Sequence, residues 1–368
     1  MWRMRVAVVT TWYPTDDSPH AMPFLPNHVE LIARRHDVRV VHLMLRQSGP
    51  PRWGEWQGVP VLRMPAGRIG SLHGARQLRG MLRGADVLHS MAYSTTLALA
   101  PLLPPTPWVH SEHWSGVLAP ASVGPAWRRA AWLRHSLRLP HLVTAVSETL
   151  RRAIRPFARP GRVRVWPNVV RYTDPLTAGP GRGRIIATGR LSTEKRPELA
   201  VETIAWLRRQ GHDVTLTWLG DGPLRAAALA RAEALGVARQ VRLPGAVSPR
   251  EVRRELAASD VFFLPSSVET FSVAAAEALA SGRPVVMGAV GAHREFVTPD
   301  VGRLVPGAEP ASFGGALVEM LRQAAIREPA FFAADVRSRF GPDAVADQLS
   351  GLYDELLDLR RGGSSRDA

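Results

Sequence analysis

The chain has 368 residues, 45% of them hydrophobic, which allows two substantial domains with a core in each. It contains no cysteine, and this excludes disulfide bonds, thiolate catalysis and cysteine-ligated zinc. No apolar stretch approaches the roughly 20 residues that span a bilayer, and the first residues run into a strand pattern without a signal peptide. We therefore expect a cytoplasmic protein.

The net charge of +15 is concentrated in the first half of the chain. Residues 1–175 contain 23 arginines against 9 acidic residues, which gives +14, and the remaining residues contribute the other +1. Such a positive field favours contact with an anionic membrane, with nucleic acid or with phosphorylated ligands. Part of the asymmetry is compositional, because 46 of the 47 basic residues are arginine.

Strand-like and helix-like segments alternate along the first half. A helix is expected over 26–35, and strands are expected at 5–9, 38–43, 59–63, 87–89, 108–110 and 142–146. This alternation predicts a doubly wound parallel sheet. Residues 171–184 are rich in Gly and Pro and are expected to link two domains.

The same alternation restarts after this linker. Strands are expected at 185–187, 214–219, 241–243, 261–264 and 285–287, and helices at 197–209, 224–235, 251–258 and 272–281. Two such units predict two parallel sheets that face a cleft, in domains over 1–172 and 173–342. Apolar residues recur at helical spacing over 343–359, so a last helix at about 343–360 is expected to pack back on the first domain.

Two glutamates flank a strand-to-helix junction in the segment 259–287. Glu269 lies in the loop after a buried strand, and Glu277 lies on the following helix. Ligands of open parallel sheets bind at this edge. Carboxylates accept paired hydrogen bonds from vicinal hydroxyls, and helix amides bind phosphate, so the pair is typical of a site for a nucleotide sugar. The alternative is a solvated helix residue and an unrelated loop charge.

A basic loop opens the helix predicted at 197–209. It contains Arg190, Lys195 and Arg196. Amide donors, the helix dipole and a guanidinium together suit a diphosphate. A solvated basic loop is the alternative.

Glycine-containing turns follow three further strands. The turn with Gly220 and Gly222 would let the backbone approach a ligand closely. The turn with Gly245 and Val247 would present main-chain groups to a nucleobase, and residues 288–295 would contact the diphosphate or sugar from the opposite side. Each of these turns is also ordinary turn chemistry.

Four motifs occur together: GRLSTEKRP (189–197), GDGPL (220–224), VRLPGAV (241–247) and SSVETFSVAAAEALASGRPVV (266–286). In order and spacing they resemble the retaining glycosyltransferases of family 4, also called group 1, over roughly residues 184–305, with weaker likeness in the first half. The resemblance implies the α/β GT-B fold, in which two Rossmann-like doubly wound parallel-sheet domains face a cleft, with an acceptor-side first domain and a donor-binding second domain.

The resemblance also implies roles for individual residues. Glu269 is expected to bind the hydroxyls of the donor sugar and Glu277 the ribose, while Arg190 and Lys195 bind the diphosphate. The complete expected set of donor-binding residues is Gly189, Arg190, Lys195, Gly220, Gly222, Gly245, Val247, Glu269, Phe271, Ser272, Val273 and Glu277.

The acceptor side is expected in the basic first half. His110, Glu112 and His113 follow one another at the end of the strand predicted at 108–110. Members of the family have a histidine near the reacting sugar in this loop, and we choose His113 over His110. It would donate to a sugar hydroxyl or act as a neutral group near the anomeric carbon. Buried structural histidines are the alternative, and zinc is disfavoured because no third ligand is evident.

The loop after the first strand departs from the family. Related enzymes usually have a glycine there that approaches the donor diphosphate, but residues 11–24 contain none, and Met22 stands in its place. We therefore expect this loop, with Met22, to serve acceptor binding more than phosphate binding.

Glycosyl transfer expels a nucleotide diphosphate while an acceptor hydroxyl attacks the anomeric carbon. We find no Asp-x-Asp motif for a divalent metal, and Arg190 and Lys195 supply compensating charge instead. We therefore expect no metal and no cofactor besides the nucleotide-sugar co-substrate. The resemblance implies retention by front-face attack, with His113, Arg190, Lys195 and Glu269 as the catalytic set.

The sequence thus predicts a retaining hexosyltransferase with a UDP-, GDP-, ADP- or TDP-sugar donor and a saccharide, lipid-linked or small-molecule acceptor. Two alternatives remain: a nucleotide-sugar epimerase or hydrolase of the same fold, and a non-catalytic basic protein that binds membranes or nucleic acid. No nucleic acid is expected as a partner. Arginine-rich amphipathic segments at 72–83 and 127–139 would allow peripheral contact with the inner face of a membrane, unless they pack on the sheet.

Overall fold

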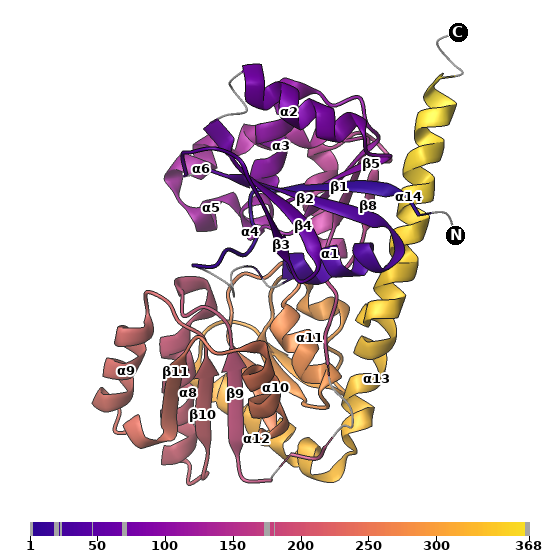
Figure 1. Cartoon of the computed structure of the whole chain (residues 1–368). Coiled ribbons are helices and arrows are strands. Elements are labelled where there is room, and N and C mark those ends of the chain that lie inside the picture. Colours follow the sequence, from indigo (N-terminus) through magenta and orange to yellow (C-terminus); the bar gives the residue numbers. More distant parts are fainter. Residues whose placement is uncertain are drawn as a thin grey trace. The chain divides into compact units, whose positions relative to one another are not determined.

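The computed structural model describes residues 3–17, 22, 24–45, 47–67, 72–172, 177–179 and 181–364, with the side chains of 72–74 and 361–364 not described. It divides the chain into two units: unit 1 comprises Met1–Val169 and Pro342–Ala368, and unit 2 comprises Val170–Gly341 (Figure 1). The domain boundary expected after residue 172 lies close to this division. Parts of the expected linker and of the loop after the first strand lie outside the described residues.

Unit 1 is built on an eight-stranded sheet with the order β3-β4-β2-β1-β5-β6-β7-β8. All neighbouring strands are parallel except β3 and β4. The strands are β1 (Arg5–Thr10), β2 (Asp37–Met44), β3 (Arg52–Trp56), β4 (Val59–Pro65), β5 (Val87–Met91), β6 (Trp108–Glu112), β7 (Leu142–Ala145) and β8 (Val163–Val165). The predicted doubly wound sheet is confirmed, while β3 and β8 are additions to the predicted strands.

Helices and 3-10 turns connect these strands, and a last helix follows at the end of the chain. The α-helices are α1 (Phe24–Arg35), α2 (Leu72–Arg83), α3 (Tyr93–Leu99), α4 (Ser115–Leu118), α5 (Pro120–Val123), α6 (Pro125–Ala130), α7 (Glu148–Ile154) and α14 (Pro342–Ser364). The 3-10 turns are η2 (Ala100–Leu102), η3 (Ala131–Arg138) and η4 (Arg155–Phe157). The local sequence explains where α7 begins, because Oγ of Ser147 accepts a hydrogen bond from the Leu150 amide at 3.1 Å and caps the helix.

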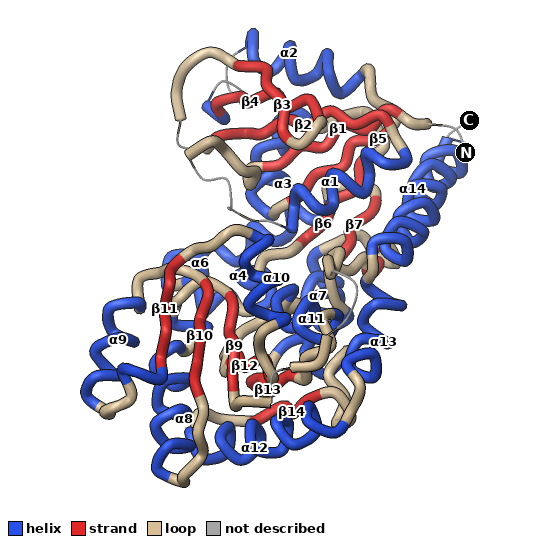
Figure 2. Tube along the Cα trace, turned by 60° about the horizontal axis from the view of Figure 1, so that its bottom comes forward, coloured by secondary structure: helices blue, strands red, loops and turns tan. Residues whose placement is uncertain are grey.

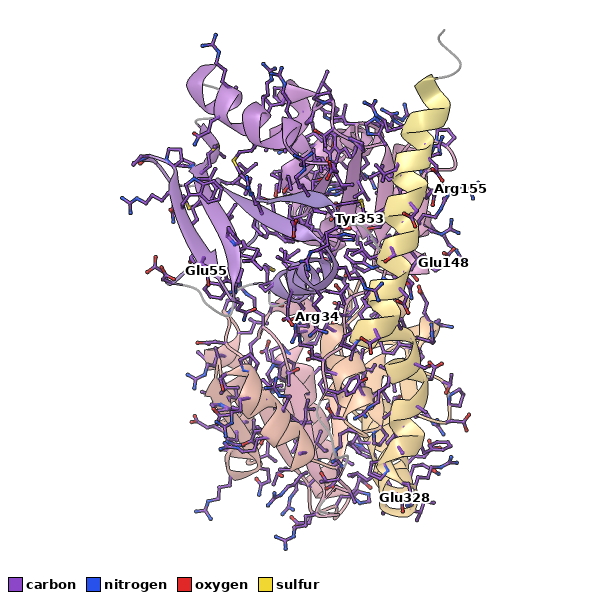
Figure 3. All side chains as sticks on the ribbon, turned by 45° about the vertical axis from the view of Figure 1, so that its right-hand side comes forward. Arg34, Glu55, Glu148, Arg155, Glu328 and Tyr353 are labelled. Atoms are coloured by element: carbon purple, nitrogen blue, oxygen red, sulfur yellow. The ribbon has the colours of Figure 1, made fainter. Side chains whose placement is uncertain are left out.

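Helix α14 belongs to unit 1 although it comes last in the chain. Val345, Leu349 and Tyr353 are buried in the same core as β1 and α1. Tyr353 extends from α14 toward the sheet (Figure 3), and its Oη lies 2.8 Å from Nδ1 of His89 in β5. The apolar stripe expected over 343–359 is therefore buried against the unit that the first half of the chain forms.

Strand β6 lies between β5 and β7, and all five of its residues are buried. Central strands of parallel sheets are covered on both faces, so a polar side chain within them must find a partner inside the fold. The polar side chains of β6 must therefore form their hydrogen bonds within unit 1.

Unit 2 has a six-stranded, fully parallel sheet with the order β11-β10-β9-β12-β13-β14 (Figure 2). The strands are β9 (Arg184–Thr188), β10 (Thr215–Leu219), β11 (Val241–Gly245), β12 (Val261–Leu264), β13 (Val285–Gly288) and β14 (Gly302–Val305). The strand order reverses between β9 and β12, and ligands of doubly wound sheets bind at the carboxyl end of such a reversal.

The helices of unit 2 follow the predicted alternation. They are α8 (Pro197–Arg209), α9 (Arg225–Ala234), α10 (Pro249–Ala257), α11 (Val273–Ala280), α12 (Pro310–Ile326) and α13 (Pro329–Phe340), with 3-10 turns η5 (Thr193–Lys195), η6 (Ala238–Gln240) and η7 (Gly291–Glu295). All elements predicted between 185 and 287 are present with small shifts of their boundaries. Strand β14 and helices α12 and α13 complete the unit beyond the predicted elements.

The two arginine-rich segments differ in structure. Residues 72–83 form α2 as expected, whereas residues 127–139 divide between the end of α6 and the 3-10 turn η3. Trp132 of η3 is 68% exposed. Among the helices of the described residues, none combines the length and the apolar character needed to cross a membrane.

Candidate functional site

Three loops of unit 2 converge at the carboxyl edge of its sheet. They follow β9, β12 and β13, which are neighbours in the sheet in the order β9-β12-β13. The loop after β12 is tied to the loop after β9, because the Ser267 amide donates to the carbonyl of Glu194 at 2.7 Å. The candidate site is therefore built at the reversal point of the strand order.

Glu269 lies where the three loops meet. Its side chain is buried, and Oε1 accepts hydrogen bonds from Nζ of Lys195 and, at 2.9 Å, from Oγ of Ser266. Lys195 comes from η5 and Ser266 from the loop after β12, so the carboxylate joins both loops. The structure thus brings together two residues that the sequence predicted separately as donor-binding.

Lys195 is the only lysine in a sequence with 46 arginines. An ammonium is a compact point charge, whereas a guanidinium is a broad planar fork that requires more room. The confined position beside the buried Glu269 suits the smaller group, and a freely solvated position would accept either. This contrast speaks against the alternative of a merely solvated basic loop.

The ionisation of Glu269 reflects its partners. Burial acts to raise its pKa, but the Lys195 ammonium, His293 and the hydrogen bonds from Lys195 and Ser266 outweigh burial and hold the pKa below its ordinary value of 4.5. Glu269 is therefore a carboxylate at neutral pH, with lone pairs that can accept hydrogen bonds from hydroxyls.

His293 is a member of this cluster that the sequence predictions missed. It lies fully buried in η7, and its Nδ1 donates to the carbonyl of Gly288 at 2.7 Å. Burial lowers its pKa, more than the attraction of Glu269 raises it, so the ring is neutral and Nε2 is its acceptor. Nε2 is buried and has no hydrogen-bond partner among the described residues. The only sequence signal was its place in the loop 288–295.

Gly291 explains how η7 reaches Glu269. Its φ is +55°, and a Cβ at this position would lie 1.8 Å from the carbonyl oxygen of Glu269. Only glycine permits this backbone contact. The loop after β13 therefore contributes to the cluster, as the sequence predicted in general terms for residues 288–295.

The predicted glycine turn after β10 has a different contact from the one expected. A Cβ on Gly220 would lie 2.1 Å from the carbonyl oxygen of Gly189, and a Cβ on Gly222 would lie 2.4 Å from that of Leu191. In this structure the glycines let two loops of the chain approach each other, where the sequence suggested close approach to a ligand. Their donor-binding role stays a prediction, whereas their packing role is a finding.

The other basic residues of the loop after β9 differ in their partners. Arg190 is exposed and has no ion pair among the residues that the structure describes. Arg196 has a φ of +51° at the start of α8, and its Nη1 donates to the carbonyl of Gly307 at 3.0 Å. Arg190 therefore remains available to a phosphate, and Arg196 holds the loop after β14.

The residues before α11 complete the predicted donor side. Phe271 is buried against Phe296 and Phe340, with ring centroids 5.4 and 5.0 Å away. Ser272 adopts a φ of +67°, and its buried Oγ has no hydrogen-bond partner among the described residues. Val273 begins the helix. The aromatic packing fixes the position at which the first amides of α11 are presented.

Glu277 lies in α11 and is half-buried. Burial raises its pKa to about 7, although Arg253 and Arg171 pull it down. Gly245 and Val247, the predicted nucleobase contacts, lie at the end of β11 and beyond it, and the Gly220 amide donates to the carbonyl of Gly245 at 2.8 Å. The roles of these three residues stay predictions.

In unit 1, His110 and Glu112 are fully buried within β6. Nε2 of His110 lies 3.2 Å from Oε2 of Glu112, and Nδ1 lies 2.9 Å from Oγ of Ser90. Oε1 of Glu112 accepts the backbone amides of His113 and Trp114, both at 2.9 Å. The polar atoms of His110 and Glu112 are thus engaged within unit 1. Their acceptor-side role stays a prediction.

His113 is also buried, in the loop after β6. Its ring packs against Phe24 and His28 of α1, with centroids 5.0 and 5.3 Å away. Burial lowers the pKa of His113 well below 6.5, and the neighbouring His28, His110 and His89 add to this shift. His113 is therefore neutral at physiological pH.

Comparison with known protein families accounts for both halves of the chain. The family described as "Glycosyl transferases group 1" matches residues 182–323, and the family described as "Glycosyltransferase Family 4" matches residues 28–173. The chain belongs to the group 1, family 4 glycosyltransferases. The predicted family is thereby confirmed from both the second half and the weaker-matching first half.

Several individual glycosyltransferases are similar in sequence. A D-inositol 3-phosphate glycosyltransferase of Xylanimonas cellulosilytica is 37% identical over 184 residues, which are 48% of this chain and 43% of that protein. A GDP-mannose-dependent phosphatidylinositol dimannoside mannosyltransferase of Mycobacterium tuberculosis is 36% identical over 126 residues, 34% of this chain and 32% of that protein. The chain thus spans less than half the length of these relatives.

Solved structures match over nearly the whole chain at low identity. Sucrose-phosphate synthase of Thermosynechococcus elongatus has a TM-score of 0.75 at 18% identity, covering 97% of this chain and 100% of that one. HepE of Anabaena, solved with UDP-glucose, has a TM-score of 0.74 at 18% identity, covering 96% and 100%. These matches, with the two parallel sheets, confirm the predicted GT-B fold of this glycosyltransferase family member.

Met22 is the residue predicted to replace a glycine of related enzymes. Its φ is +49°, in the left-handed region that favours glycine, and its side chain is 42% exposed. Its carbonyl accepts the Leu25 amide at 3.1 Å and so starts α1. The backbone keeps a conformation that glycine adopts freely, while the methionine adds a side chain at this point. Its acceptor-side role stays a prediction.

No metal site was predicted. Over the described part of the chain, no group of three or more His, Asp or Glu side chains is placed to hold a metal ion. Metal independence of the reaction itself stays a prediction.

Proposed function

We propose that the protein is a glycosyltransferase that moves a sugar from a nucleotide-sugar donor to an acceptor hydroxyl, with retention and without a metal ion. The observation that supports this most is the pair formed by the half-buried Lys195 and the buried Glu269 at the carboxyl edge of β9 and β12, directly before α11. The pair places a positive group that can bind a diphosphate beside a carboxylate that can bind sugar hydroxyls, so one nucleotide sugar can contact both.

The donor would be held from both ends. Lys195 and the exposed Arg190 bind the diphosphate, helped by the first amides of α11 and by Oγ of Ser272. Glu269 accepts hydrogen bonds from the sugar hydroxyls, with Nε2 of His293 as a further acceptor. Glu277 binds the ribose as a carboxylate. The glycine turns after β10 and β11 shape the part of the site that binds the nucleotide.

The chemistry would rest on charge stabilisation at the leaving group. As the bond between the anomeric carbon and the phosphate oxygen breaks, negative charge grows on the diphosphate, and Lys195 and Arg190 offset it without a metal. The departing oxygen takes the proton of the acceptor hydroxyl on the same face, which retains the configuration. Front-face attack forms no bond between sugar and protein, so Glu269 is not a nucleophile here; its Oε1 is held by Lys195 and Ser266, and the carboxylate binds sugar hydroxyls.

His113 would take part as a neutral group on the acceptor side. Its lowered pKa removes the role of a charged acid at neutral pH. Peripheral attachment to an anionic membrane is a further part of the proposal, and the exposed Trp132 among the arginines of η3 supports it.

The donor class is tested by thermal unfolding with UDP-, GDP-, ADP- and TDP-sugars. UDP and GDP come first, since HepE was solved with UDP-glucose and the mycobacterial relative is named for GDP-mannose. A donor present at about 100 times its Kd adds about 2.7 kcal/mol of stability. We expect one base to raise the midpoint clearly above the others.

Incubation with that donor alone separates the alternatives. A transferase consumes the donor efficiently only when an acceptor is added. Release of free sugar or appearance of an isomerised nucleotide sugar without acceptor would identify a hydrolase or an epimerase instead. Salt-sensitive binding to anionic liposomes or DNA, with no donor stabilising the protein, would identify a non-catalytic binder.

A further inference from the structure

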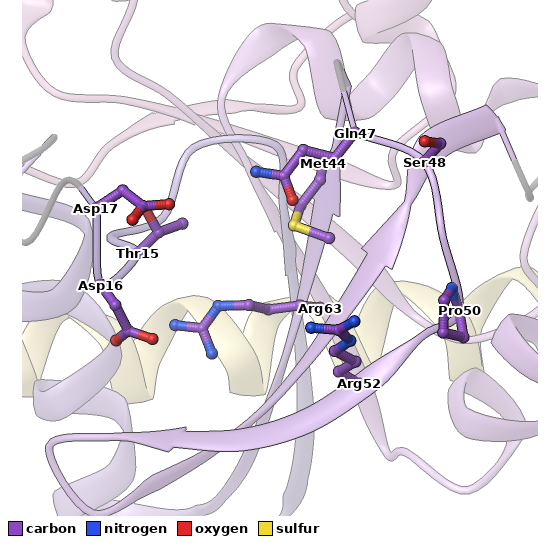
Figure 4. A pocket seen from close by; sticks show the side chains of 9 residues that line it. All are labelled: Thr15, Asp16, Asp17, Met44, Gln47, Ser48, Pro50, Arg52 and Arg63. Carbon is purple, nitrogen blue, oxygen red and sulfur yellow. The ribbon is translucent and has the colours of Figure 1, made fainter.

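Unit 1 contains a pocket that none of the predicted site residues lines. Its volume is about 290 Å³, and its walls come from the loop after β1, the segment after β2, and the paired strands β3 and β4 (Figure 4). The polar groups that matter are Asp16, Asp17, Gln47, Ser48, Arg52 and Arg63.

The pocket opens at the carboxyl edge of the unit 1 sheet. Arg63 pairs with His42 near the ends of the parallel strands β4 and β2. Arg52 begins β3, which runs antiparallel to β4, so it lies at the same edge. Ligands of open α/β sheets bind at this edge. The loop after β1 contributes Asp16 and Asp17 where the strand order reverses between β1 and β5.

Arg52 and Arg63 lie directly opposite each other in the β3–β4 ladder. Side chains of such a pair share one face of the sheet, and like charges in this arrangement destabilise it. Among the described residues, no carboxylate lies within ion-pair distance of either guanidinium, although Asp16 and Asp17 line the same pocket. Nη2 of Arg63 donates to the carbonyl of Pro14 at 3.3 Å.

Other arginines of this unit do find carboxylates. Arg5 pairs with Asp86 at 2.8 Å, and Arg164 pairs with Glu355 at 2.5 Å. Arg63 is half-buried, and a desolvated guanidinium has more to gain from an anionic partner than an exposed one. The two aspartates are exposed and keep their hydration. The two guanidinium groups therefore lack an anionic partner, and an anion bound between them would supply one.

We propose that this pocket binds an oxyanion carried by the acceptor, a phosphate or a carboxylate on a small hydroxylated ring. Arg52 and Arg63 bind the oxyanion, and Asp16 and Asp17 accept hydrogen bonds from ring hydroxyls. Two adjacent guanidinium forks match the several oxygens of such a group. The volume is close to the lower end of small-molecule sites, about 300 Å³, which suits one substituted ring. The proposal rests on the proposed function, since it takes the ligand to be the acceptor.

The test is calorimetric titration of the full chain with D-inositol 3-phosphate, with free inositol, with glucuronate and with inorganic phosphate. We expect D-inositol 3-phosphate or glucuronate to bind at least about 10-fold more tightly than inositol, since hydrogen bonds between a guanidinium and an oxyanion are stronger than those between neutral groups. Vesicles with phosphatidylinositol in phosphatidylcholine separate a lipid-borne phosphate from a free one. Equal affinity for inositol and its phosphate, or no binding of any probe, would overturn the proposal.

Variants assign the binding to the pocket. Arg52→Gln and Arg63→Gln, singly and together, should weaken the charged probe at least about 10-fold, and Arg39→Gln, an exposed arginine on β2 outside the pocket, should leave it unchanged. Thermal unfolding checks that each variant is folded. Unchanged affinity in the double variant would refute the assignment.

Donor binding measured in parallel keeps this test apart from that of the proposed function. If the charged probe binds through the two arginines but no nucleotide sugar binds, the pocket stands and the proposed transferase activity fails. If a donor binds and transfer proceeds equally in the double variant, the pocket proposal fails and the activity stands.

Discussion

The two units differ in where their predicted site residues lie relative to the ends of the strands. In unit 2, Lys195 and Glu269 form a charged pair beyond the ends of β9 and β12. In unit 1, His110 and Glu112 lie inside β6 and bond to each other and to the backbone. Glu269, His110 and Glu112 are buried and Lys195 is half-buried, but only the Lys195–Glu269 pair lies past the last residues of its strands. We therefore expect position relative to the strand end to separate groups that bind a ligand from groups that support the fold.

The largest effect is expected for Lys195→Ala, which tests whether the charged pair of unit 2 binds the donor. Removal of one charge that stabilises the departing diphosphate should lower the transfer rate by about 10²–10³-fold, which corresponds to about 2.7–4 kcal/mol. Steady-state transfer with the identified donor measures this, and circular dichroism checks the fold. Arg209→Ala, an exposed charge at the end of α8, is the matched control. Full activity in the Lys195 variant would remove it from the site.

Glu112→Ala tests whether the buried carboxylate of unit 1 has a structural role. It leaves the buried amides of His113 and Trp114 and one nitrogen of His110 without their acceptor, and it should cost about 3 kcal/mol of stability. Urea unfolding measures the change, with the exposed Glu55→Ala as control. If the variant keeps its stability but loses transfer, Glu112 has a direct chemical role and does not act only as a support.

The pH dependence of donor binding would sharpen the comparison with a smaller effect. The pKa of Glu277 is raised to about 7, so the folded protein favours its protonated form. Its contribution to stability is therefore full below pH 4.5 and is lost as pH rises to about 7. A ribose bound by the carboxylate should bind about 10-fold more tightly at pH 8 than at pH 6.

Titration calorimetry at several pH values measures this change in affinity. Glu277→Gln should show a flat profile over the same range and so separates Glu277 from groups on the donor itself. An affinity that stays constant or falls between pH 6 and pH 8 in the unaltered protein would contradict a ribose contact by the carboxylate.

Most of the fold could be predicted because its elements carry strong local signals. The helix at Pro197–Arg209 has a proline at its first position and an apolar face, and the sequence placed it correctly. Strand β3, Arg52–Trp56, escaped prediction because it is exposed, contains Gly54 and pairs at the sheet edge. Because the strand is exposed and pairs only with β4, its sequence shows no alternation of apolar and polar residues.

The site could be predicted as a set of loops but not as a set of contacts. The motifs indicated Lys195 and Glu269, yet their pairing depends on β9 and β12 being neighbours, which local sequence does not state. His293 was missed because its burial results from three loops meeting. His110 and Glu112 were assigned to the acceptor because a strand predicted to end at 110 in fact continues to 112 between two covered neighbours.

The path of the chain has a consequence for the order in which the protein is completed. The Val170 amide donates to the carbonyl of Phe340 at 2.9 Å, so a hydrogen bond joins the first residue of unit 2 to the last but one. Unit 2 is one continuous stretch of sequence, whereas unit 1 needs α14 to bury its core and to supply Tyr353 to His89. On the ribosome, unit 2 can therefore fold while unit 1 still waits for its last helix. The half that is synthesised first is finished last.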